Sequence, residues 1–207
     1  KRDRATSNIC TAQVLLSVMA GMYAVYHGKD GLIKIATKIA TLTQLLENGI
    51  SSLDYNQENE NFFDTLKIKV SSEDKDKIKK LAETNHLNFR YFETDHIGIS
   101  LDETTQVSNV LDILNIFSEV SGKSLEINLN NIEDLNHNIS GNQIRNSEFL
   151  SHEVFNKYHT EHEILRYMKR LENKDLSLVH SMISLGSCTL KLNATTEMIP
   201  VTWEELT

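Results

Sequence analysis

Residues 66–77 have the sequence Leu66-Lys67-Ile68-Lys69-Val70-Ser71-Ser72-Glu73-Asp74-Lys75-Asp76-Lys77. Apolar residues alternate with lysines over 66–70, which is typical of a strand with one face in water. Two serines follow, then acidic residues, then lysines, an order that suits a serine-capped helix and its dipole. This stretch therefore predicts a strand followed directly by a solvent-exposed helix.

Two more strands and a helix are predicted after this stretch. Short apolar runs at 89–91 and 97–101 indicate strands on either side of a turn. Thr104 or Thr105 is expected to cap a last helix, which Gly122 closes.

Two helices are predicted before the first strand. One has Ser7 as its N-cap and apolar residues at helical spacing until Gly28, and we expect it to be long and largely buried. The next begins at Asp30 and is expected to stop at Asn48-Gly49. Joined by so short a connection, the two would form a helical hairpin. Together these elements predict a compact α/β or α+β unit over residues 1–122.

The composition changes after this unit. Residues 123–147 are rich in Asn, Ser, Asp and Glu, and we interpret them as a linker. Structure is expected to resume over 148–207, where Thr160 and Glu163 have the spacing of a capping box in front of a helix.

Composition and charge exclude several classes of protein. The 207 residues are 40% hydrophobic and 24% charged, which is usual for a soluble globular chain. A net charge of -8 without clustered lysines argues against a nucleic-acid partner. Cys10 and Cys188 are far apart and indicate neither a disulfide framework nor a zinc site, so we expect a reducing compartment, with one long-range disulfide as the alternative. The apolar run Val14–Tyr26 is shorter than the ~20 residues of a membrane span, and no membrane association is expected.

A polar cluster near the C-terminus is the main candidate for a functional site. Within residues 185–193 it gathers a thiol, two hydroxyls, an amine and an amide: Ser187, Cys188, Thr189, Lys191 and Asn193. These groups could contact an anionic ligand, line a catalytic pocket or decorate a turn, and their order alone does not choose between these roles.

Histidines offer weaker candidates. His159 and His162 could be half of a metal site, but no second pair of ligands is positioned by the sequence, so we expect no metal. His152, His159 and Cys188 could belong to a thiol protease, for which no local sequence pattern is present. A glycine loop for phosphate is also absent from the sequence.

Two long blocks resemble a known family. The first is Ala5-Thr6-Ser7-Asn8-Ile9-Cys10-Thr11-Ala12-Gln13. The second runs through 165–178 and 180–183 to Leu185-Gly186-Ser187-Cys188-Thr189-Leu190-Lys191-Leu192-Asn193. Both are similar to segments of the glycine cleavage system P-protein, the PLP-dependent glycine decarboxylase, in the family's order.

The resemblance implies a place within a longer enzyme. Family members look like two fused fold-type-I PLP halves, of which only the second is catalytic. Residues 1–122 would then end the first half with its small C-terminal domain, and residues 148–207 would open the catalytic half. The implied reaction uses pyridoxal 5'-phosphate to decarboxylate glycine and passes the aminomethyl carbon to the lipoyl arm of H-protein. A homodimer is also implied, in the bacterial cytoplasm or the mitochondrial matrix.

The resemblance also assigns the polar cluster. With His180, the cluster residues Ser187, Cys188, Thr189, Lys191 and Asn193 would border the PLP pocket of the complete protein. In the family the cofactor lysine follows a histidine, and no His-Lys pair occurs here. We therefore expect the PLP lysine to lie outside this chain, no catalytic residue within it, and no activity or bound cofactor for the chain alone.

Two departures from the family pattern affect no group with obvious chemistry. Glu153 stands where proline is usual, and Leu190 stands where methionine is usual.

The alternative function from the sequence is a non-catalytic scaffold or protein-interaction module, in which the polar cluster serves only a turn.

Overall fold

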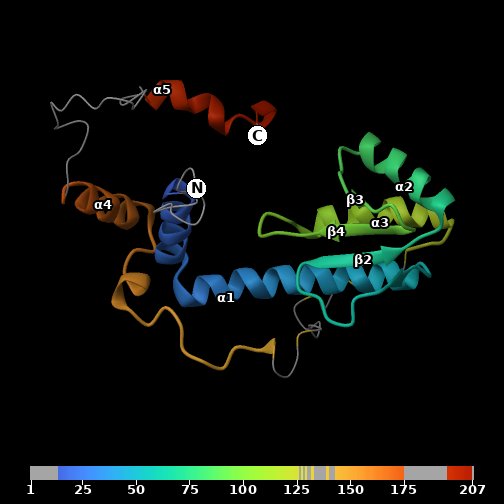
Figure 1. Cartoon of the computed structure of the whole chain (residues 1–207), viewed down its shortest axis with the longest axis horizontal. Coiled ribbons are helices and arrows are strands. Elements are labelled where there is room, and N and C mark those ends of the chain that lie inside the picture. The colour runs from blue at the N-terminus through green and yellow to red at the C-terminus, as the bar shows by residue number, and fades with distance from the viewer. Residues whose placement is uncertain are drawn as a thin grey trace, which may run out of the picture. The chain divides into compact units, whose positions relative to one another are not determined.

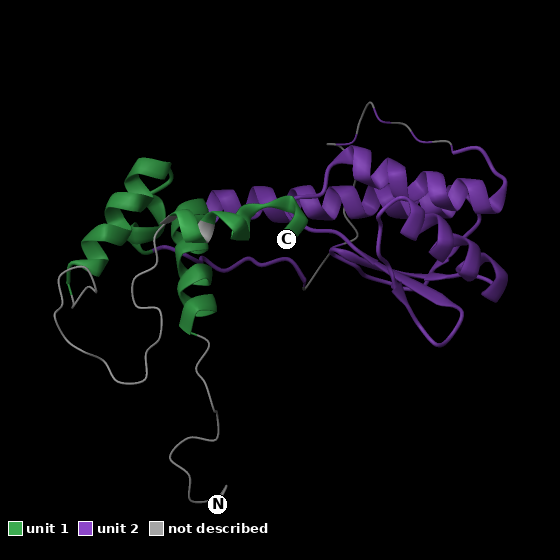
Figure 2. Ribbon diagram, turned by 90° about the horizontal axis from the view of Figure 1, so that it is seen from above, with its two compact units in different colours: residues 1–28, 152–207 green, residues 29–151 purple. Residues whose placement is uncertain are grey.

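The structure is a computed structural model that describes residues 14–125, 127, 129, 132, 139, 143–174 and 195–206. The chain divides into two compact units (Figure 2). Unit 1 contains residues 1–28 and 152–207, and unit 2 contains residues 29–151. The predicted boundaries at 122 and 148 stay predictions.

Helix α1 (Val14–Ser52) is interrupted at Gly28, which has φ 61° and ψ -172°. Only glycine adopts this conformation without strain, so the helix breaks where the sequence predicted. The break is also the boundary between the units. The hairpin arrangement of the two helical segments stays a prediction.

The prediction that the first segment is largely buried is wrong for the described residues. Leu15 is 72% exposed, Val18 51% and Met19 58%. Apolar spacing indicates that a helix face needs cover, but it does not say which part of a protein supplies that cover. More than half of each of these three side chains is exposed.

The second segment of α1 is buried as predicted, but it does not stop at Asn48-Gly49. Leu46 and Ile50 are fully buried, and the helix continues to Ser52. Gly49 lies inside the helix, where an added Cβ would be 2.6 Å from the methyl groups of Leu114. The glycine therefore permits close helix packing and is not a helix stop.

Four strands form one antiparallel sheet in the order β1-β2-β4-β3, and Figure 1 labels β2, β3 and β4. Their bounds are β1 Asn56–Gln57, β2 Thr65–Lys69, β3 Arg90–Tyr91 and β4 His96–Ser100. The three strands predicted from apolar alternation are confirmed. Strand β1 was not predicted, because a polar two-residue strand has no pattern to detect.

Strands β2 and β4 place apolar residues on one face. Leu66 is paired with Ile99 and Ile68 with Ile97, and all four side chains are buried. The lysines of β2 lie on the other face, because successive strand residues point to opposite sides.

Besides the second segment of α1, unit 2 contains the helices α2 (Ser72–Thr84) and α3 (Val107–Ser121). Ser71 caps α2 as predicted, since its hydroxyl accepts from the Asp74 N–H at 3.0 Å. The predicted threonine cap of α3 is wrong, because Gln106 is the N-cap residue. Gly122 ends α3 with φ 69°, as predicted.

Thr104 and Thr105 form a turn around Asp102 instead of capping α3. The Asp102 carboxylate accepts hydrogen bonds from the Thr104 N–H at 2.9 Å and the Thr105 N–H at 3.2 Å. Bonds from these threonines lower the pKa of Asp102. Both threonines predicted as caps of α3 are therefore bonded to Asp102 instead.

Unit 2 has one apolar cluster, to which α1, the sheet, α2 and α3 all contribute. Phe117 is fully buried at its centre, with the Tyr55 ring 5.2 Å and the Phe89 ring 6.4 Å away between centroids. Mixed helices around a small antiparallel sheet make the observed class α+β, as predicted.

Unit 1 is helical in its described residues. It includes residues 14–28 of α1. Its other elements are η4 (Glu153–Asn156), α4 (Glu161–Glu172), α5 (Thr195–Met198), η5 (Ile199–Thr202) and η6 (Glu204–Leu206). The predicted capping box of α4 is confirmed, with reciprocal bonds of 3.3 Å between Thr160 and Glu163. Across the residues that the structure describes, no helix has the length and apolar character needed to cross a membrane.

Candidate functional site

The predicted site residues all lie outside the described residues. They are His180, Ser187, Cys188, Thr189, Lys191 and Asn193. The structure describes the chain up to Lys174 and again from Thr195. The assignment of these six residues to a pocket therefore stays a prediction.

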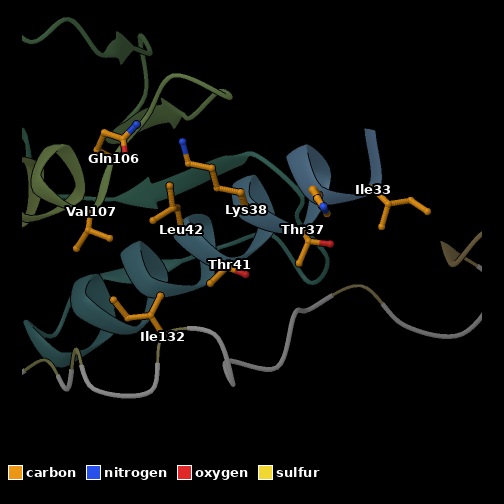
Figure 3. Close-up of a pocket in the computed structure, with 9 residues that line it drawn as sticks. Ile33, Thr37, Lys38, Thr41, Leu42, Gln106, Val107 and Ile132 are labelled. Atoms are coloured by element: carbon orange, nitrogen blue, oxygen red, sulfur yellow. The ribbon is translucent and has the colours of Figure 1, made fainter. Parts of the chain in front are cut away.

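A pocket of about 480 Å³ lies in unit 2, beside the second segment of α1 and the start of α3 (Figure 3). Its walls are mostly apolar, and two lysines are among the residues that line it. The lining residues are Ile33, Lys34, Thr37, Lys38, Thr41, Leu42, Gln106, Val107 and Ile132.

Two polar side chains at this pocket, those of Lys38 and Gln106, are bonded within the fold. The Lys38 amine donates to the Glu103 carbonyl at 2.9 Å. The Gln106 amide donates to the Thr104 carbonyl at 3.2 Å, and its backbone N–H donates to Asn109 at 2.9 Å. These contacts hold Lys38 and Gln106 in place, while Lys34, Thr37 and Thr41 also line the pocket.

A contact within unit 1 joins two segments that are distant in the sequence. His159 Nδ1 lies 2.7 Å from the Tyr26 carbonyl oxygen. Because a carbonyl only accepts, Nδ1 carries the proton and donates. Tyr26 is just before the break in α1, where helix carbonyls lose their usual partners. His159 therefore caps the C-terminal end of the first helical segment.

Gly28 is required at the same place. An added Cβ would lie 2.6 Å from the Phe155 carbonyl oxygen and 2.8 Å from His159 Cε1. Both the positive φ and the lack of space thus exclude a larger residue there. The sequence identified Gly28 as a helix stop, but nothing in the pattern indicated that His159 would pack on it.

Tyr158, which precedes α4, contacts Tyr167 and Arg170 within that helix. The rings of Tyr158 and Tyr167 stack 4.3 Å apart at 14°. The Arg170 guanidinium lies 5.5 Å from the first ring and 5.3 Å from the second. Arg170 also contacts the Tyr158 hydroxyl. These cation–π contacts stabilise the unit.

The thiol-protease alternative stays a hypothesis, because Cys188 lies outside the described residues. The N–H of Val154 donates to His152 Nδ1 at 3.1 Å, so that nitrogen is an acceptor within η4. His152 and His159 each use Nδ1 on the backbone. Among the residues that the structure describes, no three His, Cys, Asp or Glu side chains form a metal-binding group.

A charged group lies at the edge of the unit 2 sheet. Glu58 Oε2 is 2.8 Å from Lys67 Nζ and 3.0 Å from His96 Nε2. Lys67, and then His96, lower the pKa of Glu58 to about 2. His96 Nδ1 also lies 2.9 Å from the Thr94 hydroxyl. This arrangement joins β4 to the residue after β1, and surface ion pairs of this kind are usually structural.

Comparison with known proteins gives a consistent result. A family model described as "Glycine cleavage system P-protein" matches residues 1–117. The chain is 49% identical to a protein named glycine dehydrogenase (decarboxylating) from Nostoc punctiforme, over 99% of this chain and 21% of the relative. Relatives with the same name from Nostoc sp. and Bacteroides fragilis are 50% and 47% identical over 99% of this chain, and over 21% and 22% of their own lengths. The chain thus spans about a fifth of the length of these relatives.

Proposed function

The chain belongs to the glycine cleavage system P-protein family, and from this premise we propose that it is part of a PLP-dependent enzyme that decarboxylates glycine. The aminomethyl carbon that remains passes to the lipoyl arm of H-protein. The observation that carries the proposal is the family match, which covers more than half of the chain. The name glycine dehydrogenase (decarboxylating), given to long relatives, supports it.

The polar cluster is our candidate for a wall of the cofactor pocket in the complete protein. Pyridoxal 5'-phosphate, when bound, supplies the electron sink for loss of the glycine carboxylate. Ser187 and Thr189 offer hydroxyls and Asn193 an amide, which can donate to phosphate or carboxylate oxygens. Cys188, Lys191 and His180 would lie at the same wall. The lysine that binds the cofactor is expected outside residues 1–207.

Unit 2 has a structural role in this proposal. Its apolar cluster is made of buried side chains, Lys38 and Gln106 at its pocket are bonded within the fold, and Glu58 pairs with Lys67 at the edge of the sheet. Nothing about these features requires a substrate. The alternative function, a non-catalytic scaffold or interaction module, is favoured by the same observations, and the two proposals differ in what residues 187–193 do.

Substitutions in the complete protein separate the two functions. Ser187→Ala, Thr189→Ala and Asn193→Ala should each lower glycine turnover or PLP retention by about tenfold to a hundredfold, because small losses of positioning are costly in catalysis. The free energy of unfolding should change little. Thr84→Ala is the matched control, since that hydroxyl bonds only the Lys80 carbonyl of its own helix.

Unchanged kinetics in all three variants would assign the cluster to a turn and favour the scaffold. The reading frame gives an independent check. The proposal expects it to continue past Thr207 to a His-Lys pair, and a stop codon directly after Thr207 would contradict it.

The partners and location of the complete protein are also proposals. We expect lipoylated H-protein as the acceptor of the aminomethyl group and a homodimer as the assembly. The three relatives compared come from bacteria, which supports the cytoplasm over the mitochondrial matrix.

A further inference from the structure

The helical segment 14–27 leaves large apolar side chains exposed along most of its length. They are Val14, Leu15, Leu16, Val18, Met19, Tyr23 and Tyr26. No Asp, Glu, Lys or Arg occurs between Ala5 and Gly28. Single exposed apolar residues are common on protein surfaces, but successive turns of them mark an interaction surface.

The apolar residues extend around the helix and do not follow one stripe. Val14, Leu15 and Leu16 are consecutive, so they point in directions about 100° apart at 3.6 residues per turn. The remaining side carries small residues, Ser17 and Gly21, and a Cβ added at Gly21 meets nothing within 4 Å. A helix that is apolar all round is normally enclosed by protein.

The base of this segment is fixed while the rest is uncovered. Val25 is 4% exposed, and the adjoining Tyr26 carbonyl is bonded by His159. Residues 14–21 are exposed throughout. The surface that needs cover is therefore the first two turns of the described helix, which extend away from an anchored end.

Three occupants are chemically possible: lipid, a second copy of the chain, or other polypeptide. The described helices are not long and apolar enough to cross a membrane, which disfavours lipid. A two-fold contact with a second copy covers one side of a helix and leaves the others in water. Enclosure from several sides suits the interior of a larger protein, and the relatives extend far beyond the aligned part.

We propose that residues 14–27 are an interior helix of the complete protein, enclosed by apolar side chains from polypeptide outside residues 1–207. This inference rests on the proposed function only in requiring that the chain be part of a longer protein. It does not depend on which reaction that protein catalyses.

Methionine oxidation tests the proposal residue by residue. Met19 is 58% exposed, and peroxide reacts fastest with accessible thioethers. The 207-residue chain and the complete protein are each treated with hydrogen peroxide, and sulfoxide is measured by peptide mass spectrometry. Oxidation of Met19 should be fast in the chain and several-fold slower in the complete protein. Equal rates in the two would overturn the proposal.

The same experiment identifies the other occupants. Protection of Met19 in the isolated chain that increases with protein concentration would assign the surface to a second copy. Protection of Met19 in the isolated chain at every protein concentration would show that other residues of this chain cover the surface. Either result would contradict the proposal, and neither depends on glycine turnover, so failure of the proposed reaction remains a separate result.

A pair of variants gives an independent readout. Met19→Lys should leave the unfolding midpoint of the 207-residue chain unchanged and should abolish the yield of folded complete protein. Asn115→Lys, at an exposed position of α3, is the control and should affect neither. Normal yield of the complete Met19→Lys protein would contradict enclosure.

Discussion

The segment of α1 before Gly28 is richer in apolar residues than the segment after it, and yet it is the more exposed of the two. After Gly28, Leu45, Leu46 and Ile50 are almost completely buried among the sheet, α2 and α3 of unit 2. Before Gly28, Leu15 and Leu16 are mostly in water. The difference lies in which parts of the chain supply partners, because the partners of the second segment come from nearby residues of the same unit. An apolar helix pattern thus predicts burial only where its partners are present.

The contrast should be largest for large-to-small substitutions. Phe117→Ala empties a fully buried aromatic site in unit 2 and should cost about 3–5 kcal/mol of unfolding free energy. Val18→Ala, in the exposed segment, should cost less than about 0.5 kcal/mol. Urea unfolding of the 207-residue chain measures both. Similar costs for the two variants would show that residues 14–27 are covered within this chain.

Two glycines sharpen the comparison, because alanine should have opposite effects at them. Gly49→Ala places a methyl group 2.6 Å from Leu114 and should destabilise unit 2 by about 1–3 kcal/mol through overpacking. Gly21→Ala meets no neighbour and should favour the helix by up to about 1 kcal/mol. Urea unfolding measures the first effect, and circular dichroism measures the helical content for the second. A loss of helix in Gly21→Ala would mean that its surroundings are not open.

The end of the first segment depends on a single side chain. His159→Ala removes the donor to the Tyr26 carbonyl and should cost about 1 kcal/mol locally. Amide hydrogen exchange over residues 22–28 should become faster while unit 2 is unchanged. His162→Ala, three residues later, is the matched control. Equal exchange in the two variants would show that the contact does not hold the helix end.

The smallest expected effect concerns acid stability of unit 2. Folding lowers the pKa of Glu58 from 4.5 to about 2, so its stabilising contribution is present above the unfolded pKa and is lost as the pH falls from about 4.5 to 2. Glu58→Gln should weaken the dependence of the urea midpoint on pH in this window. An unchanged pH dependence in Glu58→Gln would show that Glu58 does not contribute to the acid stability of unit 2.

Much of the fold follows from local patterns. Leu66 and Ile68 identified β2 by alternation, and Ser71 and Thr160 identified helix starts because their hydroxyls bond nearby N–H groups. These features depend on residues within a few positions of each other. The Gly28 break was also predictable, since glycine tolerates the conformation.

The remaining features depend on distant contacts. The role of Gly49 is set by Leu114, and the role of Thr104 is set by Asp102, which competes with the α3 cap. His159 acquires its function from Tyr26, far away in the sequence. None of these partners is visible in a periodic pattern. The density of polar residues marked 187–193 as a candidate site, but only the resemblance gave it a role, because its residues have no spacing that specifies a reaction.

The most direct test of the central claim is the release of carbon dioxide from carboxyl-labelled glycine, measured with PLP and lipoylated H-protein. We predict release by the complete protein and none by the 207-residue chain, which lacks the expected cofactor lysine. Release by the chain alone, with PLP bound to one of its own lysines, would contradict the account.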